Sequence, residues 1–230
     1  MNELKNYRKN DIERKLNYAG FRPFDILVLG ATGSGKSTTL NAIMNGVTAK
    51  VGTGTDPETM EIDDYSLNDY VRLWDSPGLG DGIERDAIHS KKLIDMLYAT
   101  YQMNGRTYGL IDIVLVLIDG SSRDMGTVYQ LINNVIIPNF QKDRIIVAIN
   151  QADIAMKGRY WNHTRNMPDY ELEAFLDDKA ESVRKRIYEA TGVSIKKPVC
   201  YSAEQKYNVI KLYDRLIDNI PTQRRPLVKK

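Results

Sequence analysis

The sequence predicts an α/β protein with a doubly wound, mostly parallel β-sheet and one antiparallel edge strand. Short apolar runs, such as residues 111 to 118 and 144 to 149, are typical of buried central strands and alternate with longer segments of helical periodicity. A glycine-rich segment lies between the first apolar run and the helical pattern that follows it. Sheets of this type bind ligands at the carboxyl ends of their strands, so we expect the functional residues there.

The composition favours a single domain. A chain of 230 residues is long enough for one such domain with additions, but short for two independent ones. The net charge of +2 gives no overall argument for a nucleic-acid surface. The single cysteine, Cys200, excludes an intramolecular disulfide and lies in an apolar stretch, as expected for a buried strand cysteine in a reducing compartment. No segment approaches the roughly 20 apolar residues of a membrane span and the N-terminus does not resemble a signal peptide, so we expect a cytoplasmic protein without a transmembrane segment.

The first 20 residues predict a helix that ends at Gly20 and Pro23. One face of this helix is apolar, which fits either packing on the flank of the domain or binding to a partner or a membrane surface. The predicted organisation is an N-terminal helical extension (residues 1 to 23), a main domain (24 to 220) and a loose, basic C-terminal tail (221 to 230).

A motif of the form G-x-x-x-x-G-K-[ST] follows the first expected strand, at about residues 25 to 29, and precedes a helix at about 36 to 45. Glycines let consecutive backbone N–H groups point at phosphate oxygens, and the helix adds its positive end. Lys36 would reach the β- and γ-phosphates as the catalytic cation, and the Ser37 hydroxyl would bind Mg²⁺. The predicted phosphate-binding residues of this loop are Gly30, Ala31, Thr32, Gly33, Ser34, Gly35, Lys36, Ser37 and Thr38.

The segment after this helix, residues 47 to 61, has neither a helical nor a strand period, so we expect a mobile loop that is a candidate lid over the phosphates. An antiparallel hairpin is expected next, with strands at about 60 to 66 and 70 to 74. The remaining expected elements are a helix at 85 to 102, a strand at 111 to 118, a helix at 125 to 136, a strand at 144 to 149, an irregular excursion at 153 to 169, a helix at 170 to 190, a strand at 199 to 202 and a helix at 208 to 220.

A second motif, D-x-x-G, follows the hairpin at Asp75 to Gly78. In this position the aspartate would hold Mg²⁺, directly or through water, and the N–H of Gly78 would bind a γ-phosphate. The pattern is weak in isolation, because it arises often by chance. Its place on the strand after the phosphate-binding unit gives it weight.

A third and a fourth motif indicate which base a bound nucleotide would carry. The sequence Asn150-Gln151-Ala152-Asp153 follows a buried strand, and the carboxylate of Asp153 can accept hydrogen bonds from the ring N–H and exocyclic amine of guanine. Adenine has no such pair of donors on that edge. A backbone N–H of Ser202 or Ala203, after the last strand, could donate to the guanine carbonyl. The predicted guanine-binding residues are therefore Asn150, Gln151, Asp153, Ser202 and Ala203.

With these four motifs in this order, the chain resembles the P-loop GTPases of the translation-factor-related class, in the branch that contains Ras, Era and the dynamin and septin relatives. The resemblance covers about residues 24 to 220. Within the branch, the Asn-Gln-Ala-Asp motif and the long segment after it are similar to the bacterial Era-like, ribosome-binding GTPases. The resemblance implies a Ras-like P-loop GTPase fold that binds GTP or GDP with Mg²⁺.

Three positions depart from the family pattern. Gln151 stands where the family usually has a lysine, and Gly33 stands where potassium-activated Era relatives have an asparagine, so we do not expect potassium activation. Leu79 follows the D-x-x-G glycine, where Ras-like members keep the glutamine that orients the attacking water. We therefore expect slow intrinsic turnover, on the order of 10⁻³ s⁻¹ or less.

The expected lid contains three threonines that could supply a further Mg²⁺ ligand. Residues 56 to 61 resemble the Ras switch segment, so Thr59 is favoured as the metal-binding and catalytic threonine, with Thr55 second and Thr53 third. Outside the motifs, we expect Trp161 to pack under the excursion, and Arg85 and Arg123 to be surface arginines rather than arginine fingers.

The leading hypothesis is a Mg²⁺-dependent GTP-binding protein that hydrolyses GTP slowly and acts as a conformational switch. An alternative is a septin-like module that forms a homodimer through its nucleotide face, with hydrolysis incidental. An ATP-dependent kinase is disfavoured by Asn150 and Asp153. The downstream effector is not encoded in any motif, and a ribosome or RNA partner follows from the family resemblance alone.

Overall fold

The computed structural model describes residues 3–20, 23–44, 64–80, 82–122 and 125–227. The expected lid at 47 to 61 lies outside these ranges, together with its threonines Thr53, Thr55 and Thr59. Arg123 also lies outside them.

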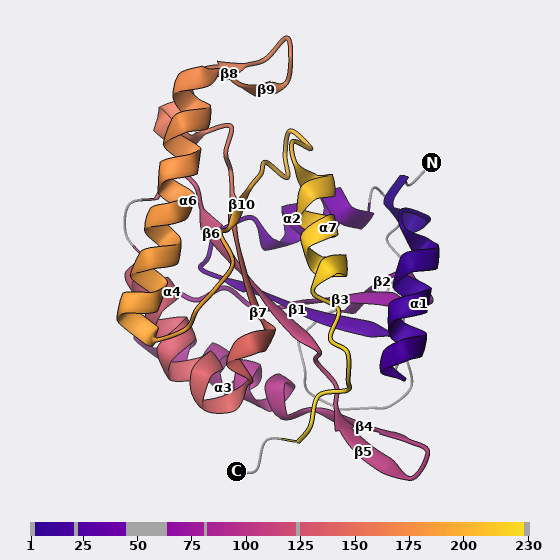
Figure 1. Cartoon of the computed structure of the whole chain (residues 1–230). Coiled ribbons are helices and arrows are strands. Elements are labelled where there is room, and N and C mark those ends of the chain that lie inside the picture. The colour runs from indigo at the N-terminus through magenta and orange to yellow at the C-terminus, as the bar shows by residue number, and fades with distance from the viewer. Residues whose placement is uncertain (1–2, 21–22, 45–63, 81, 123–124, 228–230) are drawn as a thin grey trace.

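A six-stranded sheet in the order β10-β7-β6-β1-β3-β2 forms the centre of the molecule (Figure 1). Every neighbouring pair is parallel except β2 with β3, which is antiparallel at the edge of the sheet. The predicted α/β class with one antiparallel edge strand is therefore confirmed. The strands are β1 (Phe24–Gly30), β2 (Asp64–Asn68), β3 (Val71–Asp75), β6 (Ile113–Asp119), β7 (Ile145–Asn150) and β10 (Val199–Cys200).

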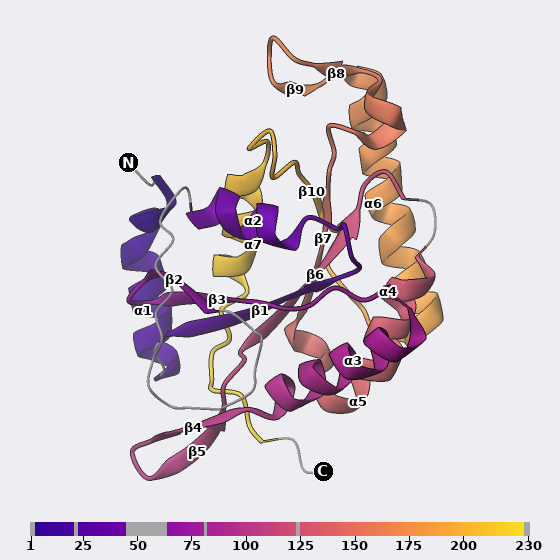
Figure 2. The same ribbon diagram turned by 180° about the vertical axis from the view of Figure 1, so that it is seen from behind.

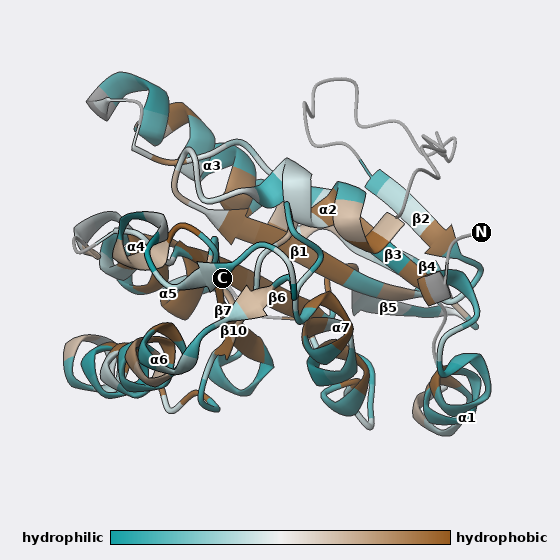
Figure 3. Ribbon diagram, turned by 90° about the horizontal axis from the view of Figure 1, so that it is seen from above, coloured by the Kyte–Doolittle hydropathy of each residue, from teal (hydrophilic) through white to brown (hydrophobic). Residues whose placement is uncertain are grey.

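Helices cover both faces of the sheet (Figure 2). Because side chains alternate along a strand, Ile26 and Val28 of β1 enter one apolar cluster, while Leu27 and Leu29 enter the other. Figure 3 shows that hydrophobic residues are concentrated on the strands between the helices. The first cluster includes α1 (Lys9–Ala19), α2 (Lys36–Met44) and α7 (Val209–Asp218). The second includes α3 (Ile83–Tyr98), α4 (Gly126–Gln130), the π-helical η2 (Leu131–Ile136), α5 (Ile137–Asn139) and α6 (Tyr170–Thr191).

The N-terminal segment packs on the flank of the domain, which is one of the two alternatives left open by its amphipathic pattern. It forms a short 3-10 turn, η1 (Glu3–Lys5), and then α1, which ends at Gly20 in the left-handed conformation as predicted. Ile12 and Leu16 are buried in the core. Arg8 pairs with Asp214 and Asp218 of α7 at 2.8 and 2.6 Å, so α1 and α7 are joined by charge as well as by apolar contacts.

The expected helix at 85 to 102 is too long at its C-terminal end. Helix α3 ends at Tyr98, and the chain then forms a hairpin of β4 (Thr100–Met103) and β5 (Arg106–Gly109). The physical reason is the turn Asn104-Gly105, whose residues have φ of 51° and 71°. An Asn-Gly pair between short strands is a strong hairpin signal, because both positions of a type I′ turn need a positive φ.

The excursion after β7 carries a second small hairpin at the opposite end of the molecule (Figure 1). The hairpin pairs β8 (Trp161–Asn162) with β9 (Met167–Pro168) and follows the 3-10 turn η4 (Ala155–Gly158). Another 3-10 turn, η3 (Lys142–Arg144), precedes β7. Trp161 is buried and meets the ring of Tyr207 edge-on at 5.4 Å. Its predicted role in packing under the loop is confirmed.

The expectation of a loose C-terminal tail is wrong at Arg224 and Arg225, which are buried. Arg225 is only 2% exposed, donates a hydrogen bond to the carbonyl of Leu97 at 2.7 Å and lies over the ring of Phe140 at 4.9 Å. Leu97 belongs to the last turn of α3, whose carbonyls have no partner within the helix. The guanidinium therefore caps α3, and its planar group stacks well against an aromatic ring.

The neighbouring Arg224 fixes the tail at two further points. It donates to the carbonyl of Gly20 at 2.7 Å and lies over Tyr101 and Tyr108 of the β4–β5 hairpin at 4.9 and 5.0 Å. The tail thus ties the end of α1, the hairpin and α3 together at the end of the sheet where the parallel strands begin.

We predict that Arg225→Ala lowers the free energy of unfolding by about 2 to 3 kcal/mol, because it leaves a cavity beside Phe140 and a buried carbonyl at Leu97 without its donor. Denaturant unfolding followed by circular dichroism measures this. The control is Arg14→Ala, which removes a mostly exposed arginine paired with Asp11 and should change stability by less than about 0.5 kcal/mol. Equal effects of the two variants would show that the tail does not stabilise the fold.

Candidate nucleotide-binding site

The predicted phosphate loop connects the end of β1 to the start of α2. Gly33 and Gly35 have φ of 79° and 81°, in the left-handed region that glycine adopts without strain. A Cβ atom on Gly35 would lie 2.2 Å from the side-chain nitrogen of Asn150, so a larger residue does not fit there. The Lys36 ammonium lies 3.4 Å from the carbonyl of Gly30 and 3.3 Å from that of Ala31, which places the charge over the loop.

The two predicted Mg²⁺ ligands that the structure describes meet beside this loop. The hydroxyl of Ser37 donates to the carboxylate of Asp75 at 3.0 Å. Asp75 ends β3, and the next residue, Ser76, donates its hydroxyl to the carbonyl of Val28 at 2.7 Å, which fixes the segment against β1. Mg²⁺ prefers a few protein oxygen ligands together with phosphate and water oxygens, so this pair fits the ion.

The D-x-x-G segment pairs with the phosphate loop through the backbone. The N–H of Thr32 donates to the carbonyl of Leu79 at 2.7 Å, and the N–H of Leu79 lies 3.4 Å from the carbonyl of Gly30. A Cβ atom on Gly78 would lie within 3 Å of both the backbone and the side chain of Thr32. Glycine is therefore required at position 78 for the two loops to approach this closely.

The side chain of Leu79 is buried in the apolar cluster that includes α3 and α4. It cannot hydrogen-bond to a water molecule, and it is held in the core rather than exposed beside the phosphate loop. The position at which Ras-like members have a glutamine is therefore occupied by a buried apolar side chain.

The third motif holds the phosphate loop from the other side. Asn150 is 2% exposed and makes two hydrogen bonds of 3.0 Å with its side-chain amide. It donates to the carbonyl of Ser34 and accepts from the N–H of Ala203. Gln151, with φ of 62°, donates to the carbonyl of Gly33 at 2.8 Å. Hydrogen bonds between side chains and backbone groups therefore join the loop of the phosphate motif to the loops of the two predicted base motifs.

Around the expected position of the base, Asp153 is partly exposed, whereas Ser202 and Ala203 are buried. The N–H of Ala203 donates to Asn150, and that of Ser202 donates to the carbonyl of Tyr207 at 3.0 Å. A guanine carbonyl at this place would have to share or replace one of these hydrogen bonds. The assignment of the two residues to the base stays a prediction.

Two residues of the site were not identified from the sequence. The hydroxyls of Tyr201 and Thr39 lie 2.7 Å apart, and Thr39 also donates to the carbonyl of Gly35 at 2.7 Å. Thr39 is adjacent to the phosphate motif, but nothing in its sequence context shows a partner 162 positions away.

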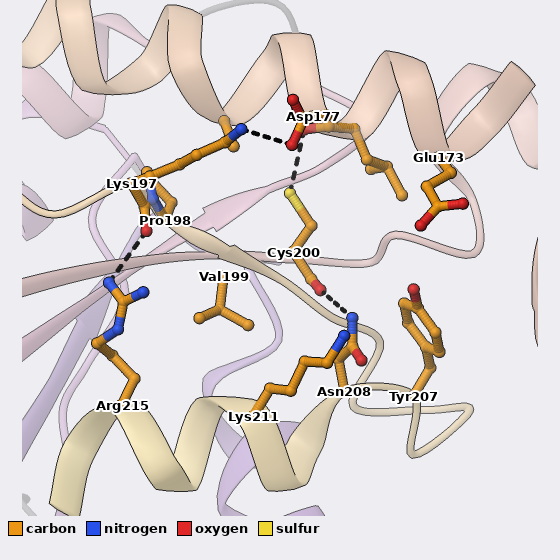
Figure 4. Close-up of a pocket in the computed structure, with 12 residues that line it drawn as sticks. Glu173, Asp177, Lys197, Pro198, Val199, Cys200, Tyr207, Asn208, Lys211 and Arg215 are labelled. Atoms are coloured by element: carbon orange, nitrogen blue, oxygen red, sulfur yellow. Dashed lines mark hydrogen bonds and ion pairs between the residues drawn. The ribbon is translucent and has the colours of Figure 1, made fainter. Parts of the chain in front are cut away.

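A groove of about 300 Å³ lies outside these loops, between α6 and α7 along the exposed edge of β10 (Figure 4). Its floor includes Cys200, whose thiol donates to the carbonyl of Leu176 at 3.4 Å. Burial raises the pKa of this thiol to about 12, which favours the protonated form at neutral pH and disfavours a nucleophilic role. The groove is also bridged by polar contacts, including an ion pair between Lys197 and Asp177.

The order of the sheet, the loop between β1 and α2, and the motifs at the ends of β3 and β7 together define a P-loop GTPase domain. This agrees with a family comparison, in which the model of the 50S ribosome-binding GTPases matches residues 25–151. The chain belongs to that family, and GTP binding and hydrolysis are the properties of its domain. The predicted class of P-loop GTPases is confirmed, whereas the Era-like subgroup stays a prediction.

Solved structures show the same fold. Toc33 from Arabidopsis thaliana, determined in complex with GDP and Mg²⁺, aligns with a TM-score of 0.63 at 16% identity and covers 98% of this chain and 95% of that chain. The bacterial dynamin GTPase LeoA from ETEC aligns with a TM-score of 0.54 at 13% identity, covering 92% of this chain and 38% of LeoA. At these identities the likeness concerns the fold, and it confirms the Ras-like architecture.

A search of the curated proteins by sequence finds no significant match. Among the described residues, no helix is both long and apolar enough to cross a membrane.

We predict that Asn150→Ala lowers the free energy of unfolding by about 2 kcal/mol, because it leaves the carbonyl of Ser34 and the N–H of Ala203 without their buried partner. Chemical denaturation of the nucleotide-free protein measures this. The control is Asn133→Ala, which removes one exposed hydrogen bond to the carbonyl of Ala190 and should cost well under 1 kcal/mol. If the two substitutions cost the same, Asn150 does not join the loops in solution.

Proposed function

We propose that the protein is a Mg²⁺-dependent GTP-binding switch that hydrolyses GTP slowly. The observation that carries this proposal is the hydrogen bonding of Asn150 to both the phosphate loop and the loop after β10, next to the Ser37–Asp75 pair. These hydrogen bonds support a single site that combines the proposed phosphate cradle, metal pair and base motif.

In this proposal the backbone of residues 30 to 38 binds the phosphates, and Lys36 neutralises charge on the β- and γ-phosphates. Ser37 and Asp75, together with Thr59 of the lid, would hold Mg²⁺. When bound, Mg²⁺ would neutralise charge on the phosphates. Asn150, Gln151, Asp153, Ser202 and Ala203 surround the base, with Asp153 selecting guanine.

Slow hydrolysis is supported by the burial of Leu79. An apolar side chain in the core cannot orient the attacking water, so among the described residues Lys36 would contribute charge stabilisation and the loop backbone would contribute positioning. We therefore propose an intrinsic turnover on the order of 10⁻³ s⁻¹ or less.

The switch is supported by the contact between Gly78 and Thr32. Beside the hydrogen bond from Ser37 to Asp75, the D-x-x-G segment is joined to the phosphate loop by two backbone hydrogen bonds of Leu79, one of them long. A γ-phosphate that accepts a hydrogen bond from the Gly78 N–H would pull on the segment, and hydrolysis would release it. The two nucleotide states would then differ in the surface formed by this segment and by the lid.

We propose a cytoplasmic protein in which residues 24 to 220 form the GTPase domain, with α1 and the C-terminal tail packed against it. The description of the family names the 50S ribosome, so a ribosomal or RNA effector is the first candidate. A second candidate function, a nucleotide-dependent homodimer with incidental hydrolysis, is favoured by the missing water-orienting residue at position 79.

We predict that Asp153→Asn lowers the affinity for GTP at least about 100-fold, because the amide loses one acceptor and presents a donor to the guanine amine. The same variant should gain affinity for xanthosine triphosphate, which has a carbonyl at that position. Equilibrium competition against a fluorescent guanine nucleotide measures both. Asp177→Asn, which changes an aspartate in the groove beside β10, is the matched control and should bind GTP normally. Unchanged GTP binding by Asp153→Asn would contradict the proposal that Asp153 binds guanine.

We predict that GTP turnover per molecule is slow, needs Mg²⁺ and stops when EDTA is added. Single-turnover assays across a wide range of protein concentration measure this and separate the two candidate functions. A rate independent of concentration supports a switch that awaits a separate activator. A rate that rises with concentration would favour the homodimer, and rapid turnover at every concentration would contradict the role given to Leu79.

A further inference from the structure

Tyr201 occupies the position directly before Ser202 and Ala203, and its backbone holds the neighbouring base motif. Its N–H donates to the carbonyl of Ile149 at 2.9 Å, and its carbonyl accepts from the N–H of Ala152 at 3.0 Å. These two contacts lie on either side of Asn150 and Gln151. The backbone of Tyr201 therefore fixes both segments that are proposed to surround the base.

The side chain of Tyr201 runs in the other direction, to the helix that follows the phosphate loop. It is fully buried, and its hydroxyl lies 2.7 Å from the hydroxyl of Thr39 in α2. The Thr39 hydroxyl has a single proton, which it donates to the carbonyl of Gly35. The direction of the chain of hydrogen bonds is thus determined: Tyr201 donates to Thr39, and Thr39 donates to Gly35.

The carbonyl of Gly35 is one end of the peptide group that joins Gly35 to Lys36. In a planar trans peptide the C=O and the N–H point in opposite directions. The Gly35 carbonyl accepts the backbone N–H of Thr39 at 2.9 Å as well as the Thr39 hydroxyl, so the hydroxyl adds a second hydrogen bond that keeps this carbonyl on the buried side and aims the Lys36 N–H into the phosphate cradle. Two successive hydroxyl hydrogen bonds in a dry environment also polarise one another, which strengthens this restraint.

A second buried tyrosine shows that burial alone does not create this arrangement. Tyr213 is 1% exposed, and within the part of the chain that the structure describes its hydroxyl has no hydrogen-bond partner. Burial raises the pKa of both tyrosines, so both hydroxyls are protonated at neutral pH. The two hydroxyls differ in their partner, since that of Tyr201 donates to Thr39 and that of Tyr213 has no hydrogen-bond partner among the described residues.

We propose that Tyr201 is a positioning residue that couples the guanine-binding segments to the phosphate loop through Thr39 and Gly35. The proposal rests on the guanine-nucleotide function proposed above and deepens it. Tyr201 does not touch the nucleotide; through Thr39 it reinforces the orientation of the Gly35–Lys36 peptide that does. Binding of the base would thereby favour the loop geometry that accepts the β-phosphate.

The test compares Tyr201→Phe with Tyr213→Phe in the full chain, since each variant removes one oxygen atom from a buried ring. Affinities for GDP and for GMP are measured by competition in the presence of Mg²⁺. We expect Tyr201→Phe to bind GDP about 5- to 10-fold more weakly, as for a lost hydrogen bond of ordinary strength. The loss for GMP should be smaller, because GMP has no β-phosphate. Tyr213→Phe should match the wild type for both nucleotides.

The GDP-to-GMP affinity ratio separates positioning from a general loss of stability, which would lower both affinities alike. Thr39→Val should lower the ratio as Tyr201→Phe does, Thr39→Ser should restore it, and adding Tyr201→Phe to Thr39→Val should cause no further loss. If Tyr201→Phe is poorly folded, the Thr39 pair tests the same chain of hydrogen bonds. An unchanged ratio in Tyr201→Phe or in Thr39→Val overturns the coupling while leaving GTP binding intact. A wild-type protein that binds no guanine nucleotide would instead overturn the proposed function.

Discussion

The site depends on one side chain, that of Asn150, which joins two loops that come from distant parts of the sequence. Its amide has one donor end and one acceptor end, and it uses them on the carbonyl of Ser34 and the N–H of Ala203. An ionised carboxylate could not do this, because it offers only acceptors. Since the group is buried, both hydrogen bonds must be made together, and the two loops are held at a fixed separation.

The parallel sheet makes this junction possible. Strands β1, β6, β7 and β10 are neighbours in the order β10-β7-β6-β1, so the loops that leave their carboxyl ends lie along one edge. At the opposite end of the sheet, ionisable side chains are buried. Burial, and then the neighbouring carboxylate of Asp25, raises the pKa of Asp112 well above its usual value, and Arg144 binds backbone carbonyls of Asp112 and the C-terminal tail. These contacts stabilise the sheet whose strands carry the loops of the site.

Much of the fold follows from local sequence signals. The apolar runs at β1, β6 and β7 predict buried parallel strands, and the glycine-rich loop predicts where the site lies. The β4–β5 hairpin was missed because the helical pattern of α3 continues past Tyr98, although Asn104-Gly105 carries the correct signal. The packed tail was missed because arginines normally indicate an exposed segment, and their partners, the α3 carbonyl and three aromatic rings, come from distant parts of the chain.

The site residues divide in a similar way. Residues that belong to a motif, such as Lys36 and Asp75, could be identified because the motif fixes both the residue type and its spacing. Tyr201 and Thr39 could not, since a hydrogen bond between residues so far apart depends on how α2 packs against the end of β10. The bonding of Gln151 to the carbonyl of Gly33 belongs to the same class. Sequence patterns thus identify groups that face the ligand, and tertiary packing determines the groups that hold them.

The most direct measurement is equilibrium competition between GDP and ADP for the purified wild-type protein in the presence of Mg²⁺. The two nucleotides share every phosphate contact and differ in the base, so their affinity ratio reports the joint action of the phosphate loop and the base motif. A site assembled around Asn150 and Asp153 predicts that GDP binds at least about 100-fold more tightly than ADP. Equal affinities would contradict guanine recognition and leave only a phosphate loop.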